Sequence, residues 1–102
     1  MQHYDEETYD NFMDFFDELP IAATVNGKYF AVHGGISREL TSIASINEID
    51  RRIEPEEGSL LSDMLWADPM PEKMANSVDF IENRARGTSC NYGKRPLTRL
   101  LK

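Results

Sequence analysis

The dipeptide Asn26-Gly27 is the feature that most constrains how this 102-residue chain folds. It lies between two mostly apolar runs, residues 21–25 and 28–32. Asparagine followed by glycine accepts positive φ at both central positions of a two-residue loop, so the sequence predicts a β-hairpin. The end of the returning strand, residues 29–32, is apolar on both faces, and we expect it to be buried within a larger sheet.

The hairpin is followed by His33-Gly34-Gly35. A histidine at the end of a buried strand, next to two conformationally permissive glycines, is typical of a site loop. A neutral imidazole at such a position is a candidate metal ligand. A lone histidine is more often a packed or solvated side chain, and no close His, Cys or carboxylate partner follows His33 in sequence. Both interpretations therefore stay open at this point.

A helix is predicted before the hairpin, with Asp5 as its N-cap and Pro20 beyond its end. Four apolar side chains follow helical spacing and are interpreted as core: Tyr9, Phe12, Met13 and Phe16. Farther along, Ser45 and Glu48 are typical of a capping box, and Ser59 is a candidate cap for another short helix. Two apolar sets should face inward from these helices: Ile46, Ile49 and Ile53, then Leu61, Met64 and Leu65.

The last third of the chain has weaker patterns. Residues 70–83 are predicted to form a surface loop with one helical turn near 78–81, and residues 88–92 a strand. Residues 93–96 form a connection, and a helix begins at Leu97 and runs to Lys102.

The net charge of −7 disfavours nucleic acid and anionic membrane as partners, because like charges repel. No apolar run approaches the roughly 20 residues of a membrane-spanning helix. Cys90 is the single cysteine, so no internal disulfide forms, which fits a reducing, cytoplasmic compartment.

Two further segments carry candidate site residues. Arg86 beside Gly87 at a strand start is suited to hold a phosphate with parallel hydrogen bonds, although a surface arginine is the more frequent outcome. Trp66 and Asp68 precede Pro69, and a buried tryptophan with a turn-forming aspartate is the alternative interpretation there.

These segments together resemble the phosphoprotein phosphatase family of serine/threonine phosphatases. The resemblance rests on three motifs in order: Val32-His33-Gly34-Gly35, Leu65-Trp66-Ala67-Asp68-Pro69 and Arg86-Gly87. The calcineurin branch is favoured by residues 9–20, 49–51 and 54–55, and by the long run between Pro69 and Arg86. The chain departs from the family pattern at Ala67, usually serine, at Arg38, often proline, and at Cys90, usually aromatic.

The resemblance implies the α/β class, with a partial metallophosphoesterase-type β-sandwich flanked by helices and residues 1–102 as an internal portion of a catalytic domain. It implies two divalent or trivalent metal ions in the complete enzyme, iron with zinc or manganese, and His33 as a ligand of one. It gives Arg86 a catalytic, phosphate-binding role, and places Trp66 and Asp68 at the substrate groove.

The family's other ligand motifs, which are Asp-x-His, Gly-Asp-x-x-Asp-Arg-Gly and Asn-His-Glu, do not occur in these residues, and His3 matches no ligand. We therefore expect the isolated chain to be inactive. One hypothesis is a serine/threonine protein phosphatase represented by a fragment. The alternative is a truncated, non-catalytic binding module that keeps a docking surface. The resemblance implies a phosphoprotein substrate, with a calcium-binding regulatory subunit and calmodulin as candidate partners.

Overall fold

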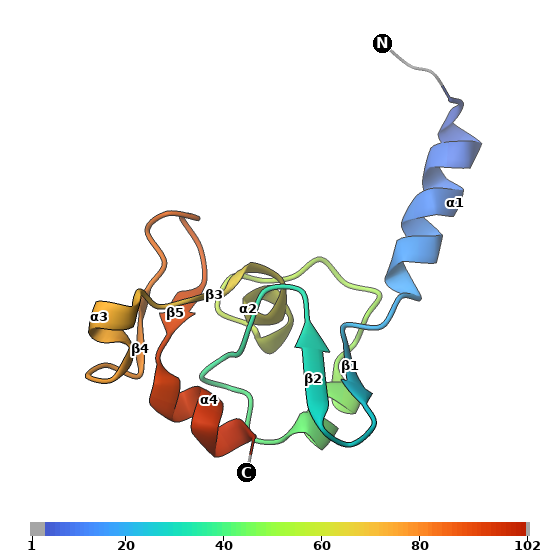
Figure 1. Ribbon diagram of the computed structural model, residues 1–102. Helices are drawn as coiled ribbons and strands as arrows, with labels where there is room; N and C mark the ends of the chain where they lie inside the picture. Colours follow the sequence, from blue (N-terminus) through green and yellow to red (C-terminus); the bar gives the residue numbers. More distant parts are fainter. Residues whose placement is uncertain (1–3, 102) are drawn as a thin grey trace.

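The computed structural model describes residues 4–101 and confirms the α/β class (Figure 1). His3 and Lys102 lie outside the described residues. The predicted hairpin is present as β1 (Ala22–Val25) and β2 (Tyr29–Val32), paired antiparallel. Asn26 and Gly27 take φ of 55° and 63°, as a two-residue hairpin loop requires.

The expected burial of β2 within a larger sheet is wrong for the described part of the chain. Its sheet there contains two strands, and Tyr29 is 68% exposed. Apolar residues on both faces of a strand indicate that something covers it, but they do not say which segment does so.

Helix α1 (Glu6–Asp17) begins and ends as predicted, but its apolar side chains are not core. Asp5 caps it through Oδ1, which accepts a hydrogen bond from Thr8 N–H at 2.8 Å. Hydrogen bonding from the Thr8 side chain, and then from its backbone N–H, lowers the Asp5 pKa. Figure 1 shows the helix projecting away from the rest of the chain, and none of its residues is buried. The four apolar side chains assigned to the core are all exposed: Tyr9, Phe12, Met13 and Phe16.

A short 3-10 helix, η1 (Ile43–Glu48), lies after the hairpin, but its cap differs from the predicted one. Ser42, rather than Ser45, is the N-cap, and its Oγ accepts the Ser45 N–H at 3.3 Å. Ser42 and Ser45 lie close together near the start of this short helix, so the sequence pattern alone does not distinguish which of them is the N-cap. Ile53 is 53% exposed, so its predicted inward orientation is also wrong.

The predicted cap of α2 (Leu60–Trp66) is confirmed, since Ser59 Oγ accepts the Ser62 N–H at 3.2 Å. Leu61 and Met64 are buried as expected, and Leu65 is half-buried. The described core gathers around this helix and consists of six apolar residues: Ile36, Leu61, Met64, Ala67, Met70 and Cys90. Burial, and then the Asp63 charge, raise the pKa of the Cys90 thiol.

Residues 68–92 form a small sheet of order β3-β5-β4, from β3 (Asp68–Pro69), β4 (Phe80–Glu82) and β5 (Cys90–Tyr92). β3 runs parallel to β5, and β4 runs antiparallel to it. The strand predicted within residues 88–92 is therefore confirmed. The helical turn predicted near residues 78–81 is wrong, because that segment enters the sheet and the turn, α3 (Glu72–Ala75), lies earlier.

Helix α4 (Lys94–Leu100) begins three residues before the predicted Leu97. Pro96 is in its first turn, where the missing N–H removes no helical hydrogen bond, so the proline is tolerated. Among residues 4–101, no helix is long and apolar enough to cross a membrane.

Candidate active site

His33 lies exposed at the end of β2, on a loop that is hydrogen-bonded to α2. Gly34 N–H donates to the Met64 carbonyl at 2.8 Å. A Cβ on Gly34 would lie 2.6 Å from the Leu65 carbonyl carbon, so a side chain does not fit there. The close approach of the two backbones fixes where His33 stands beside the end of α2.

The two glycines after His33 are required by packing, not by backbone conformation. Neither has positive φ. A Cβ on Gly35 would meet the Tyr92 ring of β5, just as one on Gly34 would meet α2. The predicted site loop is thus held between α2 and the small sheet, although the conformational reason given from sequence was wrong.

Trp66 and Asp68 lie at the junction of α2 and β3. The Ala67 N–H donates to the Asp63 carbonyl at 2.8 Å, and Ala67 itself is fully buried. Trp66 is 47% exposed, so the alternative of a buried tryptophan is excluded here. Asp68 pairs with Asn91 of β5 in the parallel register, which places its carboxylate beside the segment that joins β4 to β5.

Arg86 is carried by that segment, and buried Asn83 shapes it. Asn83 Oδ1 accepts the Arg86 N–H at 3.3 Å, and its carbonyl accepts the Gly87 N–H at 3.1 Å. Gly87 has a φ of +72°, a left-handed conformation that glycine adopts without strain. This conformation explains why a glycine follows the arginine, a point that the sequence pattern alone did not establish.

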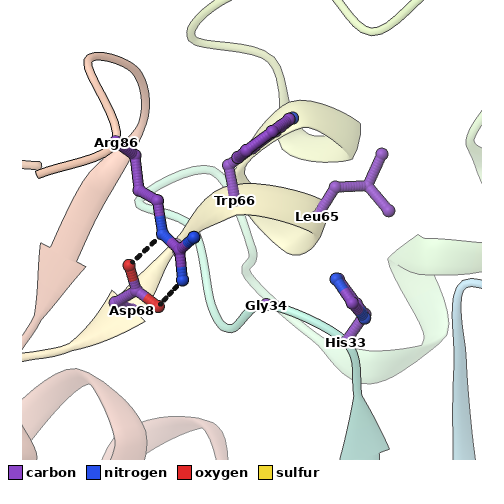
Figure 2. Close-up of a pocket in the computed structure, with 7 residues that line it drawn as sticks. His33, Gly34, Leu65, Trp66, Asp68 and Arg86 are labelled. Carbon is purple, nitrogen blue, oxygen red and sulfur yellow. Dashed lines mark hydrogen bonds and ion pairs between the residues drawn. The ribbon is translucent and has the colours of Figure 1, made fainter.

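Asp68 holds the Arg86 guanidinium with two hydrogen bonds (Figure 2). Arg86 Nε donates to Oδ2 at 2.9 Å, and Nη2 donates to Oδ1 at 3.3 Å. The Asn83 amide donates to the same Oδ2 at 2.9 Å. Arg86, and then Asn83, lower the pKa of Asp68, while Asp68 raises that of Arg86. The pair is therefore ionised at neutral pH.

One pocket of about 300 Å³ brings together the candidates taken from three separate sequence segments. Its wall includes His33, Trp66, Asp68 and Arg86, with Gly34, Leu65 and Ala67 completing it. Figure 2 shows His33 on one side of the pocket, the Arg86–Asp68 pair on the other, and Trp66 above. A hollow with a cationic donor edge, an imidazole and an exposed aromatic ring can bind an anionic group attached to a larger molecule.

A buried carboxylate that the sequence patterns did not reveal ties the two sides of this pocket together. Asp63 Oδ2 accepts from Ser37 Oγ at 2.5 Å, and Oδ1 accepts from Ser89 Oγ at 2.6 Å. Ser37 belongs to the loop after His33, and Ser89 to the loop after Arg86. An acidic residue in the first turn of a helix is ordinarily solvated and favourable to the helix dipole, so no local signal marked Asp63.

Comparison with known proteins identifies the family to which this chain belongs. A family profile described as calcineurin-like phosphoesterase matches residues 1–102, the whole chain. The chain belongs to the calcineurin-like phosphoesterase family. The resemblance to phosphoprotein phosphatases drawn from the motifs is thereby confirmed.

Relatives within the calcineurin-like phosphoesterases agree with this placement. The serine/threonine-protein phosphatase 2B catalytic subunit A1 of Saccharomyces cerevisiae (strain ATCC 204508 / S288c) is 38% identical over 111 residues, spanning all of this chain and 20% of the relative. Subunit A2 of the same organism is 43% identical over 118 residues, spanning 90% of this chain and 19% of the relative. The chain thus spans about a fifth of the length of these curated relatives.

A solved structure also has this fold. It is a protein serine/threonine phosphatase from Saccharomyces cerevisiae, described as similar to human phosphatase PP5. The TM-score is 0.77 at 25% sequence identity, over 96% of this chain and 29% of that one.

The described residues do not by themselves supply a binding site for the two metal ions that the resemblance implies. Within residues 4–101, no group of three or more His, Cys, Asp or Glu side chains is placed to hold a metal ion. His33 is the candidate that the motifs supply, and a single imidazole does not make a metal-pair site.

Proposed function

We propose that this calcineurin-like phosphoesterase chain is part of a serine/threonine protein phosphatase, and that the His33–Arg86 pocket binds the phosphate group of a phosphoprotein. The observation that carries the proposal is the convergence of His33, Trp66, Asp68 and Arg86 on one pocket, from segments up to 53 residues apart. Both curated relatives named above are serine/threonine-protein phosphatase catalytic subunits.

Arg86 is assigned the phosphate-binding role. Asp68 accepts one hydrogen bond from Nε and one from Nη2 of its guanidinium, which leaves both N–H groups of Nη1 and the second N–H of Nη2 to donate to phosphate oxygens. A fixed cationic donor lowers the free energy of a phosphoryl transition state, because negative charge shifts among the phosphate oxygens during hydrolysis. Asp68 helps here by holding the guanidinium in one orientation before the substrate arrives.

Trp66 borders the groove and is assigned to the substrate's peptide portion. Its ring is half exposed beside the phosphate-binding side chain, where aromatic surface can cover apolar parts of a bound peptide. His33 is assigned as a ligand of one metal ion, with the remaining ligands supplied by segments other than residues 4–101. From the family resemblance, we further propose that the complete enzyme binds two metal ions, iron with zinc or manganese.

The same similarity is the basis for proposing a calcium-binding regulatory subunit and calmodulin as partners. The proposal of a cytoplasmic location rests instead on Cys90 being the single cysteine. The alternative function is a non-catalytic binding module that uses the pocket to dock phosphorylated segments. The charged Arg86–Asp68 pair serves either function, but a metal-ligating His33 is needed only for hydrolysis.

An antibody raised against this chain provides the test. The protein it captures from the source organism is weighed by mass spectrometry and assayed with a phosphoserine peptide, beside the isolated 102-residue chain. We expect the captured protein to be several times heavier than 11.7 kDa and to release phosphate, and the isolated chain to release none. A captured protein of 11.7 kDa without turnover would favour the binding module.

A further inference from the structure

We propose that Asn83 is a positioning residue of this pocket, whose side-chain amide fixes Asp68 so that Asp68 presents the Arg86 guanidinium to a phosphate group. The inference rests on the proposed function, since it assigns the phosphate-binding role to Arg86. Asn83 is absent from the pocket wall and lies behind it. Its action on phosphate would therefore be indirect, through Asp68 and the Arg86 backbone.

Each polar atom of buried Asn83 has a hydrogen-bond partner within the chain. The residue is 1% exposed. Its backbone N–H donates to the Ser89 carbonyl at 3.2 Å, and its carbonyl accepts from Gly87 N–H at 3.1 Å. Its Oδ1 accepts from Arg86 N–H at 3.3 Å, and its Nδ2 donates to Asp68 Oδ2 at 2.9 Å. A buried amide with every polar atom paired holds a single orientation.

Two of these bonds act on the two members of the ion pair at once. The Oδ1 bond fixes the Arg86 backbone, and the Nδ2 bond fixes the carboxylate that orients the Arg86 side chain. The bond to Arg86 N–H is a common way to close a short turn and needs no functional reason. The bond to Asp68, 15 residues away, contributes nothing to that turn. It serves the orientation of the carboxylate.

The chemistry of the position favours asparagine. Oδ2 of Asp68 accepts from both Arg86 Nε and Asn83 Nδ2, so the carboxylate is held from two directions. A carboxylate at position 83 could still accept from Arg86 N–H, but it could not donate to ionised Asp68 and would repel it. Asp68 would then turn, and the guanidinium edge offered to phosphate would lose its fixed direction. Figure 2 shows the third guanidinium nitrogen on the side away from Asp68.

The test uses the ¹⁵N-labelled chain and inorganic phosphate, followed by NMR. The first readout needs no phosphate: the Arg86 Nε–H signal should be resolved and slow to exchange with solvent, because Asp68 accepts from it. In Asn83→Asp this signal should move toward that of Arg84, which is highly exposed. The second readout is the dissociation constant for phosphate, which should rise about fivefold, as expected from the loss of one hydrogen bond.

Asn47→Asp is the matched control, since it makes the same substitution and adds the same charge at an exposed position of η1. It should leave both readouts unchanged. If Asn83→Asp and Asn47→Asp give the same Arg86 Nε–H signal and the same dissociation constant for phosphate, Asn83 has no positioning role. If the unsubstituted chain has the ordered Arg86 signal but no response to phosphate, the proposed function is contradicted instead.

A double variant separates positioning from stability. Asn83→Asp combined with Asp68→Asn restores one amide and one carboxylate to the pair, but Arg86 then faces a neutral partner. We expect the urea midpoint to recover toward the unsubstituted value while phosphate binding stays weak. Recovery of both the urea midpoint and phosphate binding would show that Asn83 has a purely structural role. Should Asn83→Asp fail to fold, Asp68→Asn alone decides, and unchanged phosphate binding in it would overturn the inference.

Discussion

Gly34 donates its backbone N–H to the carbonyl of Met64 across 2.8 Å, so the loop that carries His33 is joined to the helix that ends at Trp66. Both sides of this contact are backbone, which cannot rotate away as a side chain can. The position of His33 relative to Trp66 therefore depends on residue 34 having no side chain.

We predict that Gly34→Ala destabilises the chain by about 2–3 kcal/mol, since the added methyl meets backbone atoms that have no room to shift. Urea denaturation measures the change. Gly58→Ala is the control, because its Cβ meets nothing within 4 Å and only the positive φ of 82° opposes it. Gly58→Ala should lower the free energy of unfolding by about 1 kcal/mol and leave the Trp66 fluorescence unchanged. An equal cost and an unchanged fluorescence in both variants would contradict the tight contact at Gly34.

Asp68 should titrate below the usual range of an aspartate, because Arg86 and then Asn83 donate hydrogen bonds to its ionised form. A pKa lower in the folded than in the unfolded state stabilises the fold above the unfolded value of about 3.9. That contribution is lost as the pH falls through the lower, folded pKa. Carbon-13 NMR of the Asp68 carboxyl measures the folded value directly.

The Asp68 pKa should rise toward its ordinary value in Arg86→Ala. Arg84→Ala is the control, since Arg84 lies in the same loop and pairs with Glu82 instead, at 3.7 Å. The same Asp68 pKa in both variants would mean that the Arg86–Asp68 ion pair does not persist in solution.

Truncation of Met64 should destabilise the chain far more than truncation of Phe16, although helical spacing alone predicts that both are core residues. Met64 is fully buried in α2, and Met64→Ala should cost about 2–5 kcal/mol through the cavity it leaves. Phe16 is 49% exposed on α1, and Phe16→Ala should change stability by about 0.5 kcal/mol or less. Urea denaturation of the two variants of the isolated chain measures both. A large loss in Phe16→Ala would show that α1 packs in solution.

The sequence predicted those elements whose signals are local. The hairpin follows from the turn chemistry of Asn26-Gly27, and α2 from the cap Ser59 with apolar residues at helical spacing. Strand β4 has only three residues, too few to produce an alternating pattern, which is why the sequence predicts a loop over residues 70–83. The apolar stripe of α1 was detected correctly, but periodicity cannot reveal that nothing in residues 4–101 buries it.

The candidate site follows from the family resemblance more than from residue patterns. His33, Trp66, Asp68 and Arg86 were each weak candidates, and only the ordered motifs of the family placed them together. Asp63 and Asn83 were missed because their roles lie in contacts with residues 15 to 26 positions away. Such partners are chosen by the fold, and neither an aspartate in a helix turn nor an asparagine before a loop signals them locally.

The central claim is that Arg86 holds the phosphate group in the proposed phosphatase. The most direct test is hydrolysis of a phosphoserine peptide by the protein expressed from its own gene, carrying either Arg86→Ala or Arg95→Ala. Arg95 is the matched control, because it is also paired with an aspartate, Asp79 at 2.7 Å, but lies outside the pocket. We predict a loss in kcat of roughly 10²–10³ for Arg86→Ala and little change for Arg95→Ala. Equal activity of the two variants would contradict the assignment.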